Sequence, residues 1–317
     1  MTTRMRLKMI AAATLVCALP ALPAMAQTAA KPKVALVMKS LANEFFLTME
    51  NGAKEHQKAH AAQYDLISNG IKDETDTSSQ IKLVEQMIVS RVNALVIAPA
   101  DSKALVPVLK RAVDAGILVV NIDNQLDAAA LKEKGISVPF VGPDNRKGAK
   151  AVGDYAASKG LKKGDQVAII EGVSTTYNAQ QRTLGFQDAM AAAGIKVVSV
   201  QSGQWEIAPG NTVAAAILNA NPNVKALLAG NDNMAIGAVS AVKAAGKTGK
   251  VIVVGYDNIN AIKPMLADGR VLATADQFGS QQAVFGIEAV LKALAEKKTQ
   301  AKLGGMIETK VELVKGK

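Results

Sequence analysis

Residues 33–46 read KVALVMKSLANEFF, and this stretch points to the fold class. Its first six residues, Lys33–Met38, form a short and nearly continuous apolar run, which predicts a strand buried on both faces of a sheet. Polar residues follow between Lys39 and Asn43, and a helical pattern begins near Phe45. The stretch therefore predicts a strand, a polar connection and a helix, which is the repeating unit of α/β proteins.

The same unit recurs along the rest of the chain. Further apolar runs of strand length occupy residues 64–68, 94–98, 118–122, 140–141, 166–171, 196–201, 226–229, 251–256 and 273–277. Helical patterns lie between them, such as residues 79–90, which carry an apolar stripe at helical spacing. Residues 102–115 form another, after Asp101 as N-cap and before Gly116 as C-cap. Repeats of this kind require right-handed crossovers, so we expect doubly wound parallel sheets.

The length and the charge pattern narrow the class of protein further. About 290 residues follow the N-terminal segment, which is more than one small core organises, so two lobes are expected. The chain has 37 basic and 27 acidic residues, a formal charge of +10. These charges are scattered, and no basic cluster is interleaved with aromatic residues, so a nucleic-acid partner is not expected.

Residues 1–26 have the pattern of a secretory signal peptide. A basic front at Arg4, Arg6 and Lys8 precedes an apolar run over residues 9–22, and Ala24-Met25-Ala26 matches a cleavage site. The run is short for a membrane span. Cys17, the single cysteine, lies inside this segment, and Val16 before it argues against lipidation. The mature chain would have no cysteine, hence no disulfide, thiolate metal site or cysteine nucleophile.

Polar residues follow nearly every expected strand. In a doubly wound sheet, ligands bind beyond the carboxyl ends of the strands. These ends include residues 39–46, 99–102, 123–125, 172–177, 230–233, 256–258 and 276–277. Turn chemistry explains some of the Asn and Asp residues there, but it does not explain the aromatic residues among them.

Several local patterns together resemble the periplasmic sugar-binding proteins of the ribose-binding type, which share their fold with the effector-binding cores of bacterial sugar repressors. The patterns are Val34-Ala35-Leu36-Val37 with Asn43-x-Phe45-Phe46, Leu95-Val96-Ile97-Ala98-Pro99-Ala100-Asp101-Ser102, Gly185-Phe186, Asn231-Asp232-x-Met234-Ala235-x-Gly237, and Val254-Gly255-Tyr256-Asp257. Each is modest alone, but their order and spacing are specific, and the resemblance spans about residues 31–317.

The resemblance implies an α/β protein of two doubly wound parallel-sheet lobes, joined by a three-segment hinge with a cleft between them. The N-terminal lobe would comprise residues 31–143 plus 278–305, and the C-terminal lobe 144–277 plus 306–317, with crossings near Pro143, Gln277 and Gly305. Such a protein binds one small sugar or sugar alcohol by hinge closure. We expect a periplasmic substrate-binding protein of an ABC importer, a monomer without cofactor. A membrane permease would recognise its closed form, and a chemoreceptor could recognise it too.

The resemblance also implies the ligand-binding residues. A sugar presents an apolar C–H face and a rim of hydroxyl groups, so its site needs aromatic rings and planar polar groups. Phe45, Phe46 and Trp205 would supply the rings. Their alternative role is ordinary core packing. The polar rim would be Asn43, Asp123, Asn231, Asp257 and Gln277, whose alternative role is turn chemistry at strand ends.

Two positions depart from the ribose-binding pattern. Relatives carry arginine directly after the first cleft aspartate and again just before the Arg-x-x-Gly-Phe stretch, whereas this chain has Asn124 and Gln180. We count both as ligand-binding positions and expect Arg182, on the same helix, to face elsewhere. An amide changes both the charge and the reach of the side chain. The hypothesis is a pentose-sized ligand or an acyclic polyol.

Other functions find less support in the sequence. No dinucleotide, Walker-type or nucleophile-elbow motif follows a strand, so no enzyme and no catalytic residue is expected. His56 and His60 are spaced four residues apart, but no third metal ligand accompanies them, which favours a solvated helix face. A repressor would need a helix-turn-helix head before the first strand. A receptor for a furanone-type signal remains open, because the same lobes could bind one.

Overall fold

The computed structural model describes residue 2 and residues 30–317, so the segment expected to be the signal peptide, with Cys17, lies outside the described residues. Residues 31–317 form one compact unit. Among the described residues, no helix combines the length and the apolar character that crossing a membrane requires.

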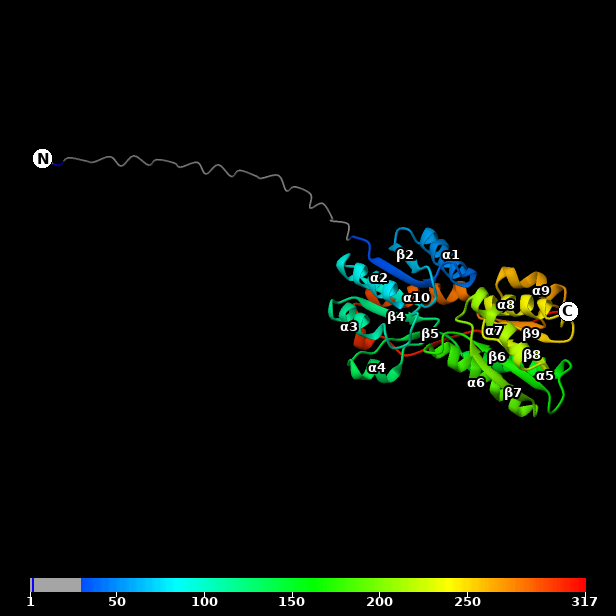
Figure 1. The fold of residues 1–317 in the computed structure, drawn as a ribbon. Helices are drawn as coiled ribbons and strands as arrows, with labels where there is room; N and C mark the ends of the chain where they lie inside the picture. Colours follow the sequence, from blue (N-terminus) through cyan, green and yellow to red (C-terminus); the bar gives the residue numbers. More distant parts are fainter. Residues whose placement is uncertain (1, 3–29) are drawn as a thin grey trace. The chain divides into compact units, whose positions relative to one another are not determined.

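The first lobe contains a six-stranded sheet in the order β11-β5-β4-β3-β1-β2 (Figure 1). Its strands are β1 (Lys33–Ser40), β2 (Asp65–Ile71), β3 (Ala94–Ile97), β4 (Leu118–Ile122), β5 (Phe140–Pro143) and β11 (Ile307–Thr309). Its helices are α1 (Glu44–Ala59), α2 (Thr77–Val89), α3 (Val106–Asp114), α4 (Ala128–Glu133), α10 (Gly279–Ala295) and the short 3₁₀ helix η2 (Gln300–Lys302). Every strand pairing in this sheet is parallel.

The second lobe repeats the arrangement, with a six-stranded sheet in the order β12-β10-β9-β8-β6-β7. Its strands are β6 (Gln166–Glu171), β7 (Lys196–Ser202), β8 (Val224–Ala229), β9 (Ile252–Val254), β10 (Ala273–Asp276) and β12 (Glu312–Lys315). Its helices are α5 (Asn145–Ser158), α6 (Tyr177–Ala192), α7 (Ile207–Ala220), α8 (Asp232–Ala244), the 3₁₀ helix η1 (Asn260–Ile262) and α9 (Lys263–Ala267). Only β12 runs antiparallel to its neighbour.

Helices cover both faces of each sheet, as the apolar strands require. In the first lobe, α2 and α3 pack on one face around Val84 and Leu109, and α1 and α10 pack on the other around Met49 and Ile287. In the second lobe, α5 and α6 cover one face and α7 and α8 the other. The expected α/β fold of two doubly wound lobes is therefore confirmed.

The chain passes between the two sheets three times: after Pro143, around Gln277, and between Thr309 and Glu312. The third crossing comes later than the Gly305 expected from the sequence, because β11 first adds an edge strand to the first sheet. The exact residue limits of the lobes remain a prediction.

Two local expectations need correction. The helix expected at residues 102–115 begins only at Val106, because Asp101 Oδ1 accepts the N–H groups of Lys103 and Ala104 in a preceding turn. The edge strands β11 and β12 were not expected from the sequence. Each has at most four residues, and much of β11 is exposed, so neither shows the apolar run of a buried strand.

Candidate functional site

A cavity lies where the carboxyl ends of the strands of the two lobes meet. Its volume is only about 10 Å³, far less than the roughly 300–1,000 Å³ typical of sites for drug-sized ligands. Twelve residues line it: Lys39, Asn43, Phe45, Phe46, Glu74, Asp123, Asn178, Arg182, Trp205, Asn231, Asp257 and Gln277. None of them is more than 8% exposed. The structure therefore shows the lobes closed on a small and mostly polar space.

The backbone at three of these positions is left-handed. Asp123 has a φ of 61°, Trp205 of 68° and Asp257 of 117°. Such values strain any residue other than glycine and persist only where the surroundings enforce them. All three residues follow the ends of strands, namely β4, β7 and β9. The strain therefore coincides with the side chains that reach the cavity.

The indole of Trp205 packs closely against two glycines, Gly172 and Gly230. A Cβ atom at Gly172 would lie 2.0 Å from the indole Cε2, and one at Gly230 would lie 3.3 Å from Cζ3. Glycine at these two strand ends thus leaves the space that the indole fills. The Asn231 amide donates to the Trp205 carbonyl at 3.0 Å and fixes the loop. Across the cavity, the rings of Phe45 and Phe46 meet edge to face at 5.1 Å.

Lys39 lies buried between two carboxylates. Its Nζ is 3.6 Å from Asp123 Oδ2 and 3.7 Å from Glu74 Oε2, both longer than a hydrogen bond. The same Nζ lies 5.4 Å from the centroid of the Phe46 ring and 5.7 Å from that of the Trp205 ring. The ammonium therefore sits between aromatic faces and acids, in a position to bind an uncharged polar molecule as well.

A second cation, Arg182, joins the walls of the second lobe. Its guanidinium donates to Asn145 Oδ1 at 2.8 Å and to the Gly230 carbonyl at 2.9 Å, and it is 3.4 Å from Asp257 Oδ1. Gln277, at the second crossing between lobes, donates to the same Asp257 oxygen at 2.7 Å. The expectation that Arg182 faces elsewhere is wrong, because its side chain lines the cavity.

Burial raises the pKa values of two acids that face these cations, Glu74 and Asp257. It raises the pKa of Glu74 to about 7, against the opposing effect of Lys39. It raises the pKa of Asp257 to about 7 as well, against the effect of Arg182. Loss of water disfavours the charged carboxylate, and each cation compensates only part of that loss. Both acids thus gain from any further hydrogen-bond donor in the cavity.

Three polar atoms of the cavity have no hydrogen-bond partner within the described part of the chain. They are Glu74 Oε2, Asp123 Oδ2 and Trp205 Nε1, all buried. Two are acceptors and one is a donor. Buried polar groups are nearly always paired in native proteins. The cavity therefore offers two free acceptors and one free donor, which hydroxyl groups could pair with because they both donate and accept hydrogen bonds.

The structure brings eight of the ten sequence-predicted residues together in this cavity and places two outside its lining. Asn124 Oδ1 is 3.3 Å from Ser102 Oγ, and its amide donates to the Pro99 carbonyl. Gln180 is exposed and donates to the Ser174 carbonyl. Ligand contact remains a prediction for all ten residues. The geometry of the cavity supports it for the eight residues that line the cavity and not for Asn124 or Gln180.

Four lining residues were missed: Lys39, Glu74, Asn178 and Arg182. Lys39 lies at the end of the first expected strand, but lysine is rarely buried, so it was not selected as a site residue. Glu74 did carry a signal, because it follows the end of β2 just as the predicted residues follow other strands. Asn178 and Arg182 are four residues apart and therefore share one face of α6.

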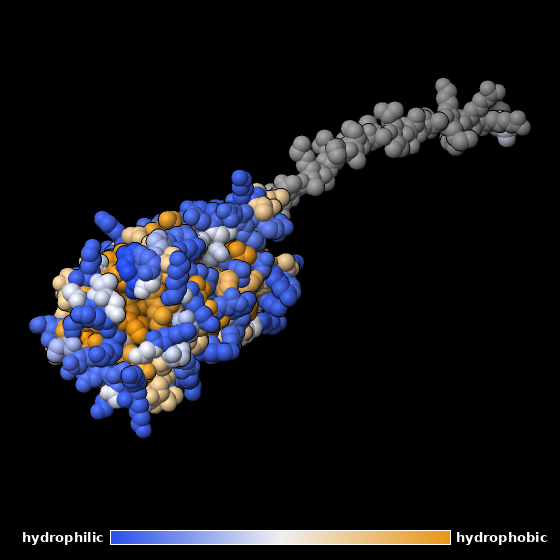
Figure 2. Space-filling view, turned by 90° about the vertical axis from the view of Figure 1, so that its right-hand side faces the viewer, coloured by the Kyte–Doolittle hydropathy of each residue, from blue (hydrophilic) through white to orange (hydrophobic). Residues whose placement is uncertain are grey.

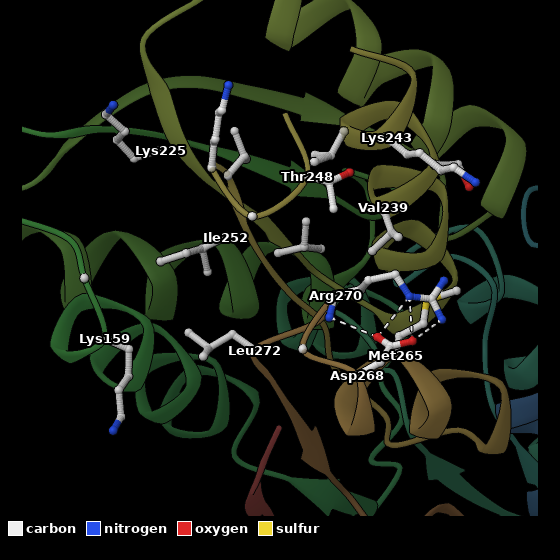
Figure 3. A pocket seen from close by; sticks show the side chains of 18 of the residues that line it. Lys159, Lys225, Val239, Lys243, Thr248, Ile252, Met265, Asp268, Arg270 and Leu272 are labelled. Atoms are coloured by element: carbon white, nitrogen blue, oxygen red, sulfur yellow. Dashed lines mark hydrogen bonds and ion pairs between the residues drawn. The ribbon is translucent and has the colours of Figure 1, made fainter. Parts of the chain in front are cut away.

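A larger hollow lies on the second lobe, away from the cavity. Figure 2 shows apolar side chains gathered in a depression ringed by hydrophilic ones on the face near α8 and α9. A pocket of about 900 Å³ in this region is lined by apolar residues such as Met265 and by several lysines. Lys159, Lys225 and Lys243 point away from one another (Figure 3), and Arg270 pairs with Asp268. Its polar groups do not converge on one point, so the hollow lacks the features of a specific ligand-binding site.

The two histidines have local roles. His56 Nδ1 lies 2.9 Å from the Tyr64 hydroxyl, and His60 Nδ1 lies 2.8 Å from the His56 carbonyl. The His56 side chain is only 11% exposed, so it packs against the first lobe rather than forming part of a solvated face. Among the described residues, no group of three His, Cys, Asp or Glu side chains is placed to hold a metal.

Comparison with known proteins agrees with this geometry. The D-ribose/D-allose-binding protein of Pseudomonas aeruginosa is 70% identical over 289 residues, 91% of this chain and 90% of that protein. The crystal structure of an ABC transporter solute binding protein from Burkholderia multivorans is 75% identical, with a TM-score of 0.89 over 90% of this chain and all of that one. It contains an unknown ligand represented as α-D-erythrofuranose.

A more distant structure shows the same fold. The solute binding protein of Actinobacillus succinogenes, with bound D-allose, is 37% identical and has a TM-score of 0.81, covering 90% of this chain and 98% of that one. A family model described as a periplasmic binding protein domain matches residues 34–298. Relatives and structures of this kind are binding proteins rather than enzymes. The chain belongs to the family of periplasmic binding proteins.

Proposed function

We propose that this chain binds one cyclic aldose of the size of ribose or allose and delivers it, chemically unchanged, to the permease of an ABC importer. The observation that carries the proposal is the closed cavity with two cations, three acids, three aromatic rings and three unpartnered polar atoms. The names of the similar proteins from P. aeruginosa and A. succinogenes support a sugar of this class.

The cavity offers each part of a sugar a matching surface. The rings of Phe46 and Trp205 suit the apolar C–H faces. Asp123 Oδ2 and Glu74 Oε2 would accept hydroxyl protons, and Trp205 Nε1 would donate to a sugar oxygen. Hydrogen bonds to charged groups are the stronger kind.

Arg182 supports a ring form over an open-chain polyol. A guanidinium donates but cannot accept, so it suits an oxygen that has no proton to give. The ring oxygen of a cyclic sugar is such an atom, whereas an acyclic polyol has only hydroxyl groups. Asn124 and Gln180 led the sequence argument toward a polyol, but neither lines the cavity.

Binding would proceed by closure. The ligand first contacts one lobe, and contacts from the second lobe then shift the balance toward the closed form. Micromolar affinity corresponds to about 8 kcal/mol. The closed surface is what the permease reads, and a chemoreceptor could read the same surface. We further propose that the protein acts as a monomer in the periplasm after removal of residues 1–26.

The test is a calorimetric titration of protein purified from the periplasmic fraction and stripped of bound ligand by unfolding and refolding. The series comprises D-ribose, D-allose, D-erythrose and ribitol. We expect micromolar or tighter binding of at least one aldose and a response to ribitol at least a hundredfold weaker. Tight ribitol binding with no aldose response would overturn the ring-sugar proposal. The intact mass of the same sample shows whether residues 1–26 are absent.

A further inference from the structure

Among the described residues, four helices of the second lobe, α6, α7, α9 and η1, begin without a side-chain cap of their own, and two of them, α6 and η1, contact side chains of the first lobe. Within residues 30–317, the side chains of the N-cap residues of α6 and η1, Thr176 and Ile259, accept no hydrogen bond from the first turn. Ile259 has no polar side-chain atom, and the Thr176 hydroxyl donates to the Val173 carbonyl instead. By contrast, Asp144 and Asn231 cap α5 and α8 in the usual way. The first N–H groups of a helix need acceptors, so α6 and η1 depend on other residues.

The acceptors come from the first lobe. Glu44, at the start of α1, accepts the N–H of Asn260 through Oε1 at 2.9 Å and that of Ala261 through Oε2 at 3.1 Å. Ser102 Oγ accepts the N–H of Tyr177, the first residue of α6, at 2.9 Å. These contacts join residues 216, 217 and 75 positions apart in the sequence. Each helix is therefore capped by a side chain from the opposite lobe.

Neighbouring groups hold Ser102 in place for this contact. Its hydroxyl donates to Asn124 Oδ1 at 3.3 Å, which leaves an oxygen lone pair for the Tyr177 N–H. The Asn124 amide is fixed in turn by donating to the Pro99 carbonyl at 2.9 Å. Neither Glu44 nor Ser102 lines the cavity. Their contacts depend on the approach of the two lobes and not on contact with a ligand.

We infer that Glu44 and Ser102 cap helices of the opposite lobe in the closed form only, and we call them closure residues. By stabilising the closed form, they would raise the affinity for the ligand. Opening breaks these contacts and leaves the N–H groups to water. When the binding-competent form is a minor population, the apparent Kd rises in proportion as that population falls. The nature of the ligand rests on the proposed function, but the effect on closure does not.

The experiment compares Glu44→Ala and Ser102→Ala with the matched control Asp127→Ala. Asp127 caps α4 by accepting the Ala130 N–H at 2.8 Å, and both residues are in the first lobe. Calorimetry with D-ribose and D-allose gives Kd, and thermal unfolding of ligand-free protein gives Tm. Nitroxide labels on Lys58→Cys and Lys250→Cys, exposed residues of different lobes, report the distance between lobes with and without sugar.

We expect Glu44→Ala and Ser102→Ala each to raise Kd about threefold to tenfold, to reduce the short-distance population of the labels, and to leave the ligand-free Tm within a degree or two. Asp127→Ala should lower Tm and leave Kd unchanged. Equal Kd values, or identical label distances in wild type and Glu44→Ala, would overturn the inference. If wild type binds neither sugar, the proposed function fails, and the label distances alone decide whether these residues act on closure.

Discussion

A single methyl group at Gly172 should weaken ligand binding although Gly172 does not line the cavity. A Cβ atom there would lie 2.0, 2.1 and 2.3 Å from three atoms of the Trp205 indole, whereas ordinary contact begins at 3.4 Å. The indole would have to move by about 1.4 Å, the difference between 3.4 and 2.0 Å. The free space around the ring is limited, because even an added Cβ at Gly230 would lie only 3.3 Å from the indole Cζ3, and Asn231 holds the Trp205 carbonyl by a hydrogen bond.

The magnitude follows from what the indole does in the proposed site. Loss of an aromatic stacking partner costs about 1–3 kcal/mol by analogy with other stacked ligands, which is about a fivefold to 150-fold rise in Kd. Overpacking also lowers stability by about 1–3 kcal/mol. Gly172 does not have a left-handed backbone, so alanine meets only the steric obstacle. Calorimetry with the preferred aldose measures the first effect, and thermal unfolding measures the second.

A double-mutant cycle separates the indole from other causes. If Gly172→Ala acts by displacing the indole, it should have almost no effect on Kd in a Trp205→Ala background. The emission spectrum of Trp205, the only tryptophan, should shift in the single variant. An equal loss of affinity in both backgrounds would refute the reasoning, because the methyl group would then act on something other than the ring.

Three further predictions concern the charged groups of the cavity. Arg182→Lys should raise Kd at least about tenfold, because a lysine cannot reproduce the planar donor fork that contacts Asn145 and the Gly230 carbonyl; an unchanged Kd would show that the fork is not used. Lys39→Met should lower the Tm of ligand-free protein at pH 8, since it leaves the carboxylates of Glu74 and Asp123 buried without their cation; an equal or higher Tm would contradict this. Burial raises the pKa of Glu74 from 4.5 to about 7, so its favourable contribution to stability is complete below about pH 4.5 and is lost as the pH rises through 7. The Tm should therefore fall across that window, and Glu74→Gln should reduce the slope; parallel Tm curves for the two proteins would count against it.

Strand ends predicted most of the candidate site because a parallel sheet brings them to one edge. Asn43, Asp123, Asn231 and Asp257 each follow an apolar run, and the structure places all four around one cavity. The same rule would have found Glu74, which follows the end of β2. Lys39 also follows an apolar run directly, but its burial could not be predicted, because it depends on carboxylates 35 and 84 positions further along the chain.

The direction of a side chain was harder to predict than its position along the chain. Asp123 reaches the cavity just beyond the end of β4, where its left-handed backbone, with a φ of 61°, turns the chain out of the strand. Asn124 points toward Pro99 and Ser102 instead. A match to the family pattern at position 124 locates a residue near the site, but it does not establish contact with the ligand.

The helix position of Arg182 changes the argument about the ligand for the same reason. On α6, residues four apart share a face, whereas residues two apart point to different sides. Asn178 lines the cavity, so Arg182 must lie beside it and Gln180 must point away, as the structure shows. Asn124 and Gln180, which replace two arginines of the family pattern, suggested a cavity lined by amides. The helical spacing instead places the Arg182 guanidinium in the cavity wall. A guanidinium there favours a ligand with an oxygen that carries no proton, such as the ring oxygen of a sugar.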